Sequence, residues 1–176
     1  MKTLEDVKKN IRDVVDFPRK GIVFKDLTTV FKDHELTNVV VNDIYESYKD
    51  KGITKVLGIE SRGFILGSIL SNKLEAGFVP VRKKGKLPAD VYSEEYALEY
   101  GTDTIEIHKD ALQHDDVILI HDDLLATGGT IGAVLRILQN FEVKKIYVNF
   151  VVELDFLKGR EIIKEYTDEV YSVINF

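Results

Sequence analysis

The chain has 176 residues, of which 44% are hydrophobic and 31% are charged, and this globular composition excludes the disordered and fibrous classes. Its formal net charge of -6 and pI near 5.3 argue against a domain that coats nucleic acid or an anionic membrane. It contains no cysteine, which excludes disulfides, thiolate catalysis and Cys-based zinc sites. The start of the chain lacks the apolar core of a signal peptide, and no run approaches the ~18 apolar residues of a membrane span, so we expect a cytoplasmic protein.

The first half of the chain is predicted to be mainly helical. Apolar residues at helical spacing predict a helix over residues 4–15, which begins at a capping box formed by Thr3 and Asp6. The Pro and Gly of segment 17–21 end this helix. The same spacing predicts a second helix over residues 36–48. The next predicted elements are a buried strand at 56–59, a turn at 61–63 and a helix at 64–74.

The second half of the chain is richer in predicted strands. Apolar runs predict strands at 77–82, 117–120, 146–152 and 170–174, with one helix at 130–138. Short apolar strands that alternate with amphipathic helices predict an α/β fold, in which helices flank a mainly parallel, twisted sheet. The length is that of a single domain, residues 1–176.

Residues 83–104 interrupt this alternation of strands and helices. The segment lies between predicted strands and is rich in Gly, Tyr and Glu. Long irregular stretches inside compact domains are uncommon and often form lids over active sites. The alternative is a solvent-exposed hairpin without a role, and the length of the segment does not decide between the two.

The segment with the clearest chemical meaning covers residues 117–130. A buried strand is followed by two adjacent acids, then by a turn that contains Gly128 and Gly129, and then by a helix. Ligands of open α/β sheets bind at the carboxyl ends of the strands. The N-terminus of a helix there offers unpaired N–H groups and a partial positive charge, which suit a phosphate.

The polar residues of this segment predict a site for a ribose 5-phosphate. Adjacent carboxylates can accept hydrogen bonds from a vicinal diol, and two threonines add hydroxyl donors. The pattern is neither a P-loop nor a dinucleotide fingerprint. The alternative is that the acids merely cap the helix. The predicted site consists of Asp122, Asp123, Ala126, Thr127, Gly128, Gly129 and Thr130.

Segment 117–130 resembles the phosphoribosyl-pyrophosphate (PRPP) signature of the type I phosphoribosyltransferases. Further segments resemble the adenine branch of that family, and the matches run from about residue 14 to 161. They lie at 17–26, 61–64, 82–88, 98–101, 152–154 and 157–160. The resemblance implies the type I phosphoribosyltransferase fold, with a small hood at about residues 1–35 and a mobile active-site loop at about 83–104.

The resemblance also implies a reaction. A pentosyltransferase of this branch transfers the 5-phosphoribosyl group of PRPP to N9 of adenine and yields AMP and pyrophosphate, a step of purine salvage. The implied partners are PRPP, adenine and a second copy of the chain in a homodimer, with neither nucleic acid nor membrane. The implied cofactor is Mg2+, which is held through PRPP oxygens and not directly by the protein.

The resemblance assigns roles to three further groups of residues. The adenine pocket comprises Val23, Phe24, Lys25, Leu124 and Leu154. The pyrophosphate group is bound by Ser61, Arg62, Arg82, Lys83 and Lys86, and one basic residue of the run 82–86 acts across the dimer interface. The catalytic residues are Glu99, Tyr100 and Arg62. Arg62 follows a strand directly and is well placed for a bidentate phosphate contact, whereas a basic run such as 82–86 is in general a solvated face.

His121 and three rival functions stay open. His121 lies where an aliphatic strand residue is expected, and a packed residue at the end of the strand is favoured over a ligand. The first rival is a transferase for guanine, hypoxanthine or xanthine. The second is a PRPP-sensing regulator without enzymatic activity, which needs a basic DNA-binding domain. The third is a pyrimidine or orotate transferase, which lacks the Phe24 segment.

Glu99 gives a test of the implied mechanism. We predict that Glu99→Leu lowers the turnover of adenine by about 10²- to 10⁴-fold, because a positioned acid–base group typically contributes that much to a rate. PRPP binding, measured by calorimetry, should change little. Glu95→Leu, which alters an acid expected to be solvated, serves as the control. Near-normal turnover of Glu99→Leu would remove this residue from the mechanism.

Overall fold

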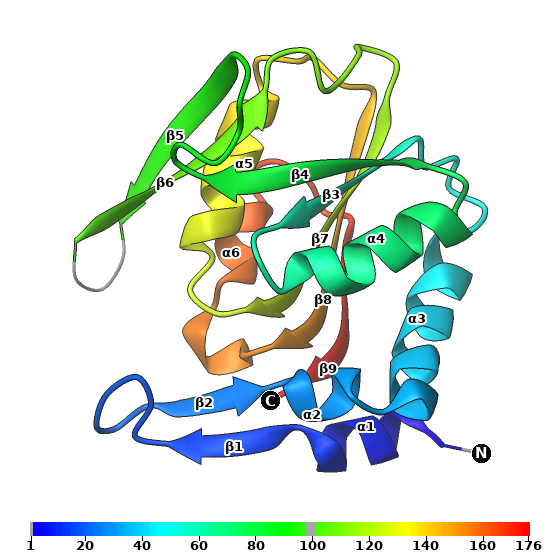
Figure 1. The fold of residues 1–176 in the computed structure, drawn as a ribbon, viewed down its shortest axis with the longest axis vertical. Helices are drawn as coiled ribbons and strands as arrows, with labels where there is room; N and C mark the ends of the chain where they lie inside the picture. Colours follow the sequence, from blue (N-terminus) through cyan, green and yellow to red (C-terminus); the bar gives the residue numbers. More distant parts are fainter. Residues whose placement is uncertain (1, 98–100) are drawn as a thin grey trace.

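The computed structural model describes residues 2–97 and 101–176 (Figure 1). Within these ranges, one large sheet has seven strands in the order β5-β6-β4-β3-β7-β8-β9. The pairs from β4 to β9 are parallel, whereas β5 and β6 form an antiparallel hairpin that joins β4 at the edge of the sheet. The strands are β3 (Lys55–Ile59), β4 (Gly77–Lys83), β5 (Val91–Ala97), β6 (Thr102–His108), β7 (Val117–Leu125), β8 (Lys145–Glu153) and β9 (Val170–Asn175).

Helices cover both faces of the sheet, and each face has its own hydrophobic core. Neighbouring residues of β7 show this division, since Leu119 packs in one core and Ile120 in the other. Side chains of consecutive strand residues point to opposite faces, so an unbroken apolar run fills both cores. Helices α3 (His34–Tyr48) and α4 (Gly63–Lys73) pack on the first face, and α5 (Gly129–Leu138) and α6 (Arg160–Ile163) on the second.

The N-terminal helix is shorter than its apolar pattern predicts. The capping box at Thr3 is confirmed, but α1 (Leu4–Asn10) ends five residues before the predicted end at residue 15. Residues 12–15 form β1 (Arg12–Val15), which pairs with β2 (Val23–Asp26) in an antiparallel hairpin. An ion pair of 2.5 Å between Arg12 and Asp26 fixes the register. Pairing with the next strand in a local hairpin therefore overrides the helical spacing of the apolar residues.

Two other segments differ from their predictions. Residues 83–104, predicted as irregular, contain the end of β4 and most of the β5–β6 hairpin. The hairpin of the alternative is therefore present, but it is not solvent-exposed throughout, because Tyr96 is buried. The strand predicted at 117–120 continues to Leu125, because β8 pairs with it as far as Glu153. The predicted helices at 36–48, 64–74 and 130–138 and the remaining predicted strands are confirmed within a few residues.

The chain order of the strands reverses between β3 and β7. From β3 the chain passes through α4 to β4 on one side, and from β7 it passes through α5 to β8 on the other side (Figure 1). Ligands of open α/β sheets bind in the crevice outside the carboxyl ends of the strands at such a reversal. Segments 60–63 and 122–130 both lie there. Within the described residues, no helix has the length and apolar character needed to cross a bilayer.

Candidate active site

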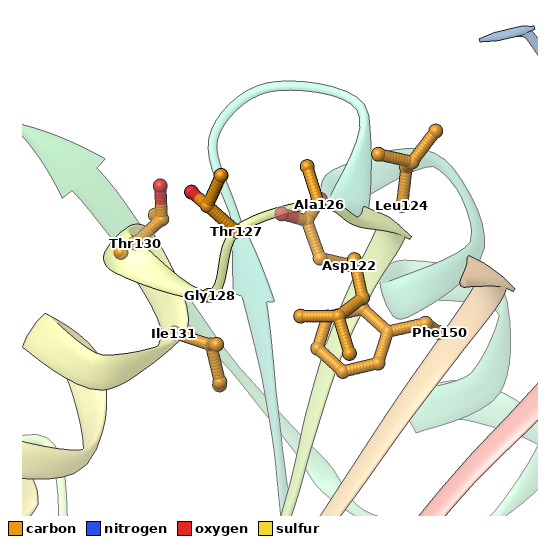
Figure 2. A pocket seen from close by; sticks show the side chains of 10 residues that line it. Asp122, Leu124, Ala126, Thr127, Gly128, Thr130, Ile131 and Phe150 are labelled. Atoms are coloured by element: carbon orange, nitrogen blue, oxygen red, sulfur yellow. The ribbon is translucent and has the colours of Figure 1, made fainter. Parts of the chain in front are cut away.

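The turn between β7 and α5 forms a small polar cavity. The cavity has a volume of about 90 Å³ and is lined by Asp122 and by every residue from Leu124 to Ile131, together with Phe150. Figure 2 shows that the side chains of Thr127 and Thr130 project from the same side of the turn. The first N–H groups of α5 have no partner within the helix, and no side chain caps its start. The cavity therefore offers amide and hydroxyl donors to an anion.

Gly128 is required by the geometry of this turn. Its φ of +86° lies in the left-handed region, which favours glycine over any residue with a side chain. A Cβ at this position would also lie 2.7 Å from the carbonyl oxygen of Gly159. The backbone of residues 126–130 therefore packs directly against the segment that precedes α6.

Asp122 and Asp123 lie within β7 and take different partners. Asp122 lines the polar cavity, and its Oδ1 accepts a hydrogen bond of 2.8 Å from the backbone N–H of Asp123. The Asp123 carboxylate is 2.9 Å from Nε of Arg62 and does not line that cavity. Consecutive residues of a strand point to opposite faces, which separates the two side chains. The structure thus brings Asp122 to the predicted ribose site and places Asp123 against Arg62.

Both carboxyl groups are held in an environment that disfavours their charge. Burial raises the pKa of Asp122 well above its ordinary value, and the adjacent charge of Asp123 raises it further. Burial also raises the pKa of Asp123, although the Arg62 guanidinium opposes this shift. Perturbed acids of this kind, at the carboxyl end of a strand and beside a cavity, are typical of functional sites.

Arg62 connects the two acids to the N-terminal hairpin. It follows β3 at the start of α4, and its side chain is 32% exposed. Its guanidinium carbon lies 5.0 Å from the centroid of the Phe24 ring, within the range of a cation–π contact. Ser61 beside it is exposed. The predicted pyrophosphate residues that follow β3 therefore lie at the same edge of the sheet as the polar cavity.

The two basic residues at the end of β4 are already engaged with acids. Nε of Arg82 lies 3.4 Å from Oε2 of Glu60, and Nζ of Lys83 lies 2.9 Å from Oδ2 of Asp103. The hydrogen bond from Lys83 lowers the pKa of Asp103. Lys86 is exposed, and its carbonyl oxygen accepts a hydrogen bond of 3.2 Å from Arg82. Glu60 and Asp103, which the sequence did not single out, hold this basic turn in place.

A second, mainly apolar cavity lies next to the first. It has a volume of about 280 Å³, and all five residues predicted for the adenine pocket line it: Val23, Phe24, Lys25, Leu124 and Leu154. The Phe24 ring packs edge-to-face on Phe17 at a centroid distance of 5.2 Å. The Lys25 side chain forms an ion pair of 2.6 Å with Asp13. Its charge is therefore neutralised, and its backbone is what remains available to a ligand in the cavity.

Four residues of this cavity escaped the sequence analysis: Ile22, Tyr96, Ala97 and Leu157. Tyr96 and Ala97 end β5, and only its pairing with β6 brings them to the site. Ile22 and Leu157 carried a weak signal, since each lies within a segment that resembles the family, 17–26 and 157–160. Glu99 and Tyr100 lie outside the described residues.

His121 is buried in the sheet beneath the polar cavity. It has no exposed surface, and its Nδ1 lies 2.8 Å from Oδ1 of Asn149 on β8. Burial lowers the pKa of His121 to about 4, although the bond to Asn149 opposes the shift. The expected packed residue in the strand is confirmed. Among the described residues, no cluster of three or more His, Asp or Glu side chains is arranged to hold a metal ion.

Comparison with known proteins places this geometry in a family. Residues 31–175 match the model of the phosphoribosyl transferase domain. The adenine phosphoribosyltransferase of Phocaeicola vulgatus is 57% identical over 92% of each chain, and that of Bacteroides fragilis is 54% identical over 97% of each chain. The chain belongs to the adenine phosphoribosyltransferase family.

Solved structures of this family have the same fold. The enzyme of Giardia lamblia, solved in complex with 9-deazaadenine, aligns with a TM-score of 0.96 and 44% identity over 100% of this chain and 99% of that chain. The adenine phosphoribosyltransferase of Thermoanaerobacter pseudethanolicus aligns with a TM-score of 0.92 and 44% identity over 98% and 99% of the two chains. The expected type I phosphoribosyltransferase fold is confirmed, and the chain is an enzyme of the pentosyltransferase class.

The raised pKa of Asp122 predicts a trade-off between stability and activity. Above the ordinary aspartate pKa of 3.8, ionised Asp122 destabilises the folded chain relative to the unfolded one, so Asp122→Asn should stabilise the ligand-free protein at pH 7. We expect a melting temperature higher by about 2–4 °C, as for a gain of roughly 1 kcal/mol. Loss of charged hydrogen bonds to the ribose should lower kcat/KM for PRPP by about 10- to 100-fold.

Asp123→Asn is the control for this experiment. It removes an adjacent carboxylate of the same strand but also breaks the pair with Arg62, so its stabilisation should be smaller. Thermal denaturation of the two variants and steady-state kinetics measure both effects. A lower melting temperature for Asp122→Asn would contradict the predicted cost of its charge.

The depressed pKa of His121 predicts a loss of stability in mild acid. The unfolded chain binds a proton at His121 near pH 6.5, whereas the folded chain binds it only near pH 4. The folded chain therefore favours neutral His121, and this preference stabilises it fully above pH 6.5. The stabilisation is lost as the pH falls from 6.5 toward 4, because the unfolded chain takes up the proton first. Urea denaturation from pH 7.5 to 4.5 should show a shallower decline for His121→Leu than for the wild type. His114→Gln, at an exposed position, should keep the wild-type slope.

Proposed function

We propose that this enzyme transfers the 5-phosphoribosyl group of PRPP to N9 of adenine and releases pyrophosphate, which makes AMP for purine salvage. The observation that carries the proposal is the wall shared by the two cavities. Five residues line both of them: Leu124, Ala126, Thr127, Gly129 and Thr130. An apolar pocket for a base and a donor-rich pocket for a phosphate therefore meet at one turn, as a 5′-nucleotide product requires.

The proposed binding of PRPP follows from the charges of the site. The N-terminus of α5 receives the 5-phosphate, with Thr127 and Thr130 as hydroxyl donors. Asp122 accepts hydrogen bonds from the ribose hydroxyls, and Asp123 assists while it holds Arg62. Arg62 and Ser61, together with Arg82, Lys83 and Lys86 of the basic turn, neutralise the pyrophosphate. When PRPP binds, its pyrophosphate replaces Glu60 as the partner of Arg82 and Asp103 as the partner of Lys83. The two cations therefore have an anionic partner both before and after binding.

The proposed reaction is a displacement at the anomeric carbon. The bond from C1′ to the adenine N9 forms, and the bond from C1′ to the pyrophosphate oxygen breaks with inversion. Positive charge accumulates on the ribose in the transition state, so the site contributes through positioning, charge placement and exclusion of water. As the bond from N9 forms, Glu99 accepts the proton that adenine loses near N7, and the pyrophosphate leaves with the electron pair of the broken bond. Tyr100 and Arg62 complete the catalytic group. Phe24 stacks on the purine between the walls formed by Leu124 and Leu154, while the backbone at Val23 and Lys25 contacts its edge.

The proposal includes Mg2+ as the cofactor. The carboxylates of Asp122 and Asp123 are hard oxygen donors that suit this ion, but Asp123 is engaged with Arg62, so oxygens of PRPP supply most of the ligands. When bound, the ion adds neutralisation of the leaving pyrophosphate. A homodimer in which a basic residue of the 82–86 turn reaches the partner's site stays a prediction from the family resemblance, as does the location in the cytoplasm.

A direct assay tests this function. The protein is incubated with PRPP, Mg2+ and one base at a time, and nucleotide and pyrophosphate are quantified together. We expect AMP and pyrophosphate in equal amounts from adenine, and little product from guanine, hypoxanthine, xanthine or orotate. Among the described residues that line the base cavity, Lys25 alone carries a formal charge and it is paired with Asp13, which disfavours an anionic base such as orotate. If adenine yields no AMP, the proposal is refuted. If another purine is turned over as fast as adenine, the proposed specificity for adenine is wrong.

A further inference from the structure

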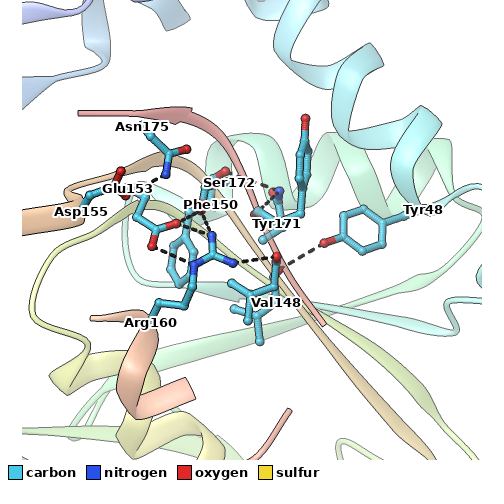
Figure 3. Close-up of polar contacts among 11 residues, drawn as sticks. Tyr48, Val148, Phe150, Glu153, Asp155, Arg160, Tyr171, Ser172 and Asn175 are labelled. Atoms are coloured by element: carbon cyan, nitrogen blue, oxygen red, sulfur yellow. Dashed lines mark hydrogen bonds and ion pairs between the residues drawn. The ribbon is translucent and has the colours of Figure 1, made fainter. Parts of the chain in front are cut away.

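An ion pair between a buried glutamate and a partly exposed arginine joins the end of β8 to the start of α6 (Figure 3). Glu153 is the last residue of β8 and is 4% exposed, and Arg160 is the first residue of α6. Nε of Arg160 donates to Oε1 of Glu153 at 2.9 Å, and Nη2 donates to Oε2. Two parallel bonds between a guanidinium and a carboxylate fix the orientation of both groups.

The same pair is tied to the neighbouring strand. Ser172 of β9 donates its hydroxyl to Oε2 of Glu153 at 2.5 Å, and Nη1 of Arg160 donates to the carbonyl oxygen of Val170 at 3.0 Å. Burial raises the pKa of Glu153, but the bonds from Arg160 and Ser172 outweigh it and hold the pKa below its ordinary value. The carboxylate is therefore ionised at neutral pH and holds Arg160 against the edge of the sheet.

The chain between the two partners contacts both proposed substrate pockets. Leu154 and Leu157 line the apolar cavity. Gly159 packs against the phosphate-binding turn so closely that a Cβ there would lie 2.3 Å from the carbonyl oxygen of Ala126 and 3.0 Å from the nitrogen of Gly128. A displacement of Gly159 would therefore move the turn, and a displacement of Leu157 would open the base pocket.

The two halves of this connecting segment have different anchors. Near its start, Asp155 accepts a hydrogen bond of 2.7 Å from Asn175, and its backbone N–H donates to Phe176 at 3.0 Å. Phe156, which follows, is 72% exposed and adds little packing. The second half contains Lys158, whose φ of 54° is left-handed, and Gly159, which leads directly into Arg160. The Glu153–Arg160 ion pair is thus the anchor of the 154–159 segment at its C-terminal end, where Gly159 contacts the turn at 126–130.

We propose that Glu153 and Arg160 are a positioning pair that sets the purine pocket and the phosphate-binding turn relative to each other. The inference rests on the proposed function, because it assigns adenine and PRPP to the two cavities. Neither residue lines a cavity that holds a substrate in this scheme, so the pair acts through the 154–159 segment. Its loss should weaken the use of both substrates together, which a residue that touches one of them would not do.

Arg160→Met tests the pair, because methionine keeps much of the length of the side chain but none of its hydrogen bonds. We expect kcat/KM to fall by about 10- to 100-fold for adenine and for PRPP alike, mainly through higher KM values, as for the loss of charge-assisted bonds. Arg160→Lys keeps the charge without the fork and should lose less for both substrates. If Arg160→Met does not fold, Arg160→Lys carries the test. Wild-type KM values in the lysine variant, or a loss confined to one substrate, would overturn the inference.

Tyr48→Phe is the matched control for a merely structural effect. Tyr48 donates a buried hydrogen bond of 3.2 Å to the carbonyl oxygen of Val148 on β8, the strand that ends at Glu153 (Figure 3). Neither Tyr48 nor Val148 lines one of the two cavities. Its removal should lower the melting temperature and leave both KM values within about twofold of the wild type. A rise in KM equal to that of Arg160→Met would show that destabilisation of β8 alone explains the effect.

Hydrogen exchange separates the positioning role from the proposed function. In the ligand-free protein, Arg160→Met should speed amide exchange in residues 154–160 and also in residues 126–130, whereas Tyr48→Phe should affect neither. Faster exchange confined to 154–160 would contradict the coupling through Gly159. Failure of the wild type to make AMP would refute the proposed function, while the exchange comparison would still decide whether the pair holds the turn.

Discussion

Parallel pairing of β3 with β7 is the constraint on which the site depends. It places the carboxyl ends of both strands at one edge of the sheet, so Arg62 after β3 meets Asp123 of β7 across 61 positions of sequence. Because the strand order reverses at this pair, the two crossover helices lie on opposite faces and leave a crevice between the loops. The turn at 126–130, the acids and Arg62 all border this crevice. The N-terminal hairpin then adds Phe24, which stacks against Arg62 and lines the apolar cavity.

Electrostatics at this edge are arranged locally and do not follow the net charge of -6. In the ligand-free chain, each of the cations Arg62, Arg82 and Lys83 faces a carboxylate. These acids hold the cations in place and reduce their mutual repulsion. Asp122, which is partly buried, and the buried Asp123 raise the free energy of the folded chain, since burial disfavours their charge. The global balance still argues against a role in coating nucleic acid, but it does not describe the affinity for a small anion.

Close backbone packing between the turn at 126–130 and the segment before α6 holds the polar cavity in shape. The turn at Gly128 and the segment at Gly159 approach each other without intervening side chains, so neither can move alone. Rigid placement of binding groups is what a displacement reaction with little covalent participation of the protein requires. In the proposed scheme, the Glu153–Arg160 pair extends this support to the sheet. The two substrate pockets then depend on one connected part of the structure.

The sequence by itself determined the α/β class, most of the strands and helices around the central sheet, and the glycine turn between β7 and α5, because these depend on local apolar periodicity and on short-range backbone requirements. Its family resemblance also named five of the residues that line the apolar cavity: Val23, Phe24, Lys25, Leu124 and Leu154. Only the tertiary structure decided the conversion of residues 12–15 into a strand, the extension of β7 past the two acids and the pairing of β5 with β6, because each depends on pairing with another strand, which the apolar periodicity within one segment does not reveal. For the same reason the sequence did not predict the ion-pair partners of Arg62, Arg82, Lys83 and Arg160. An ion pair depends on which segments meet in the folded chain, and no local pattern of residues predicts that contact.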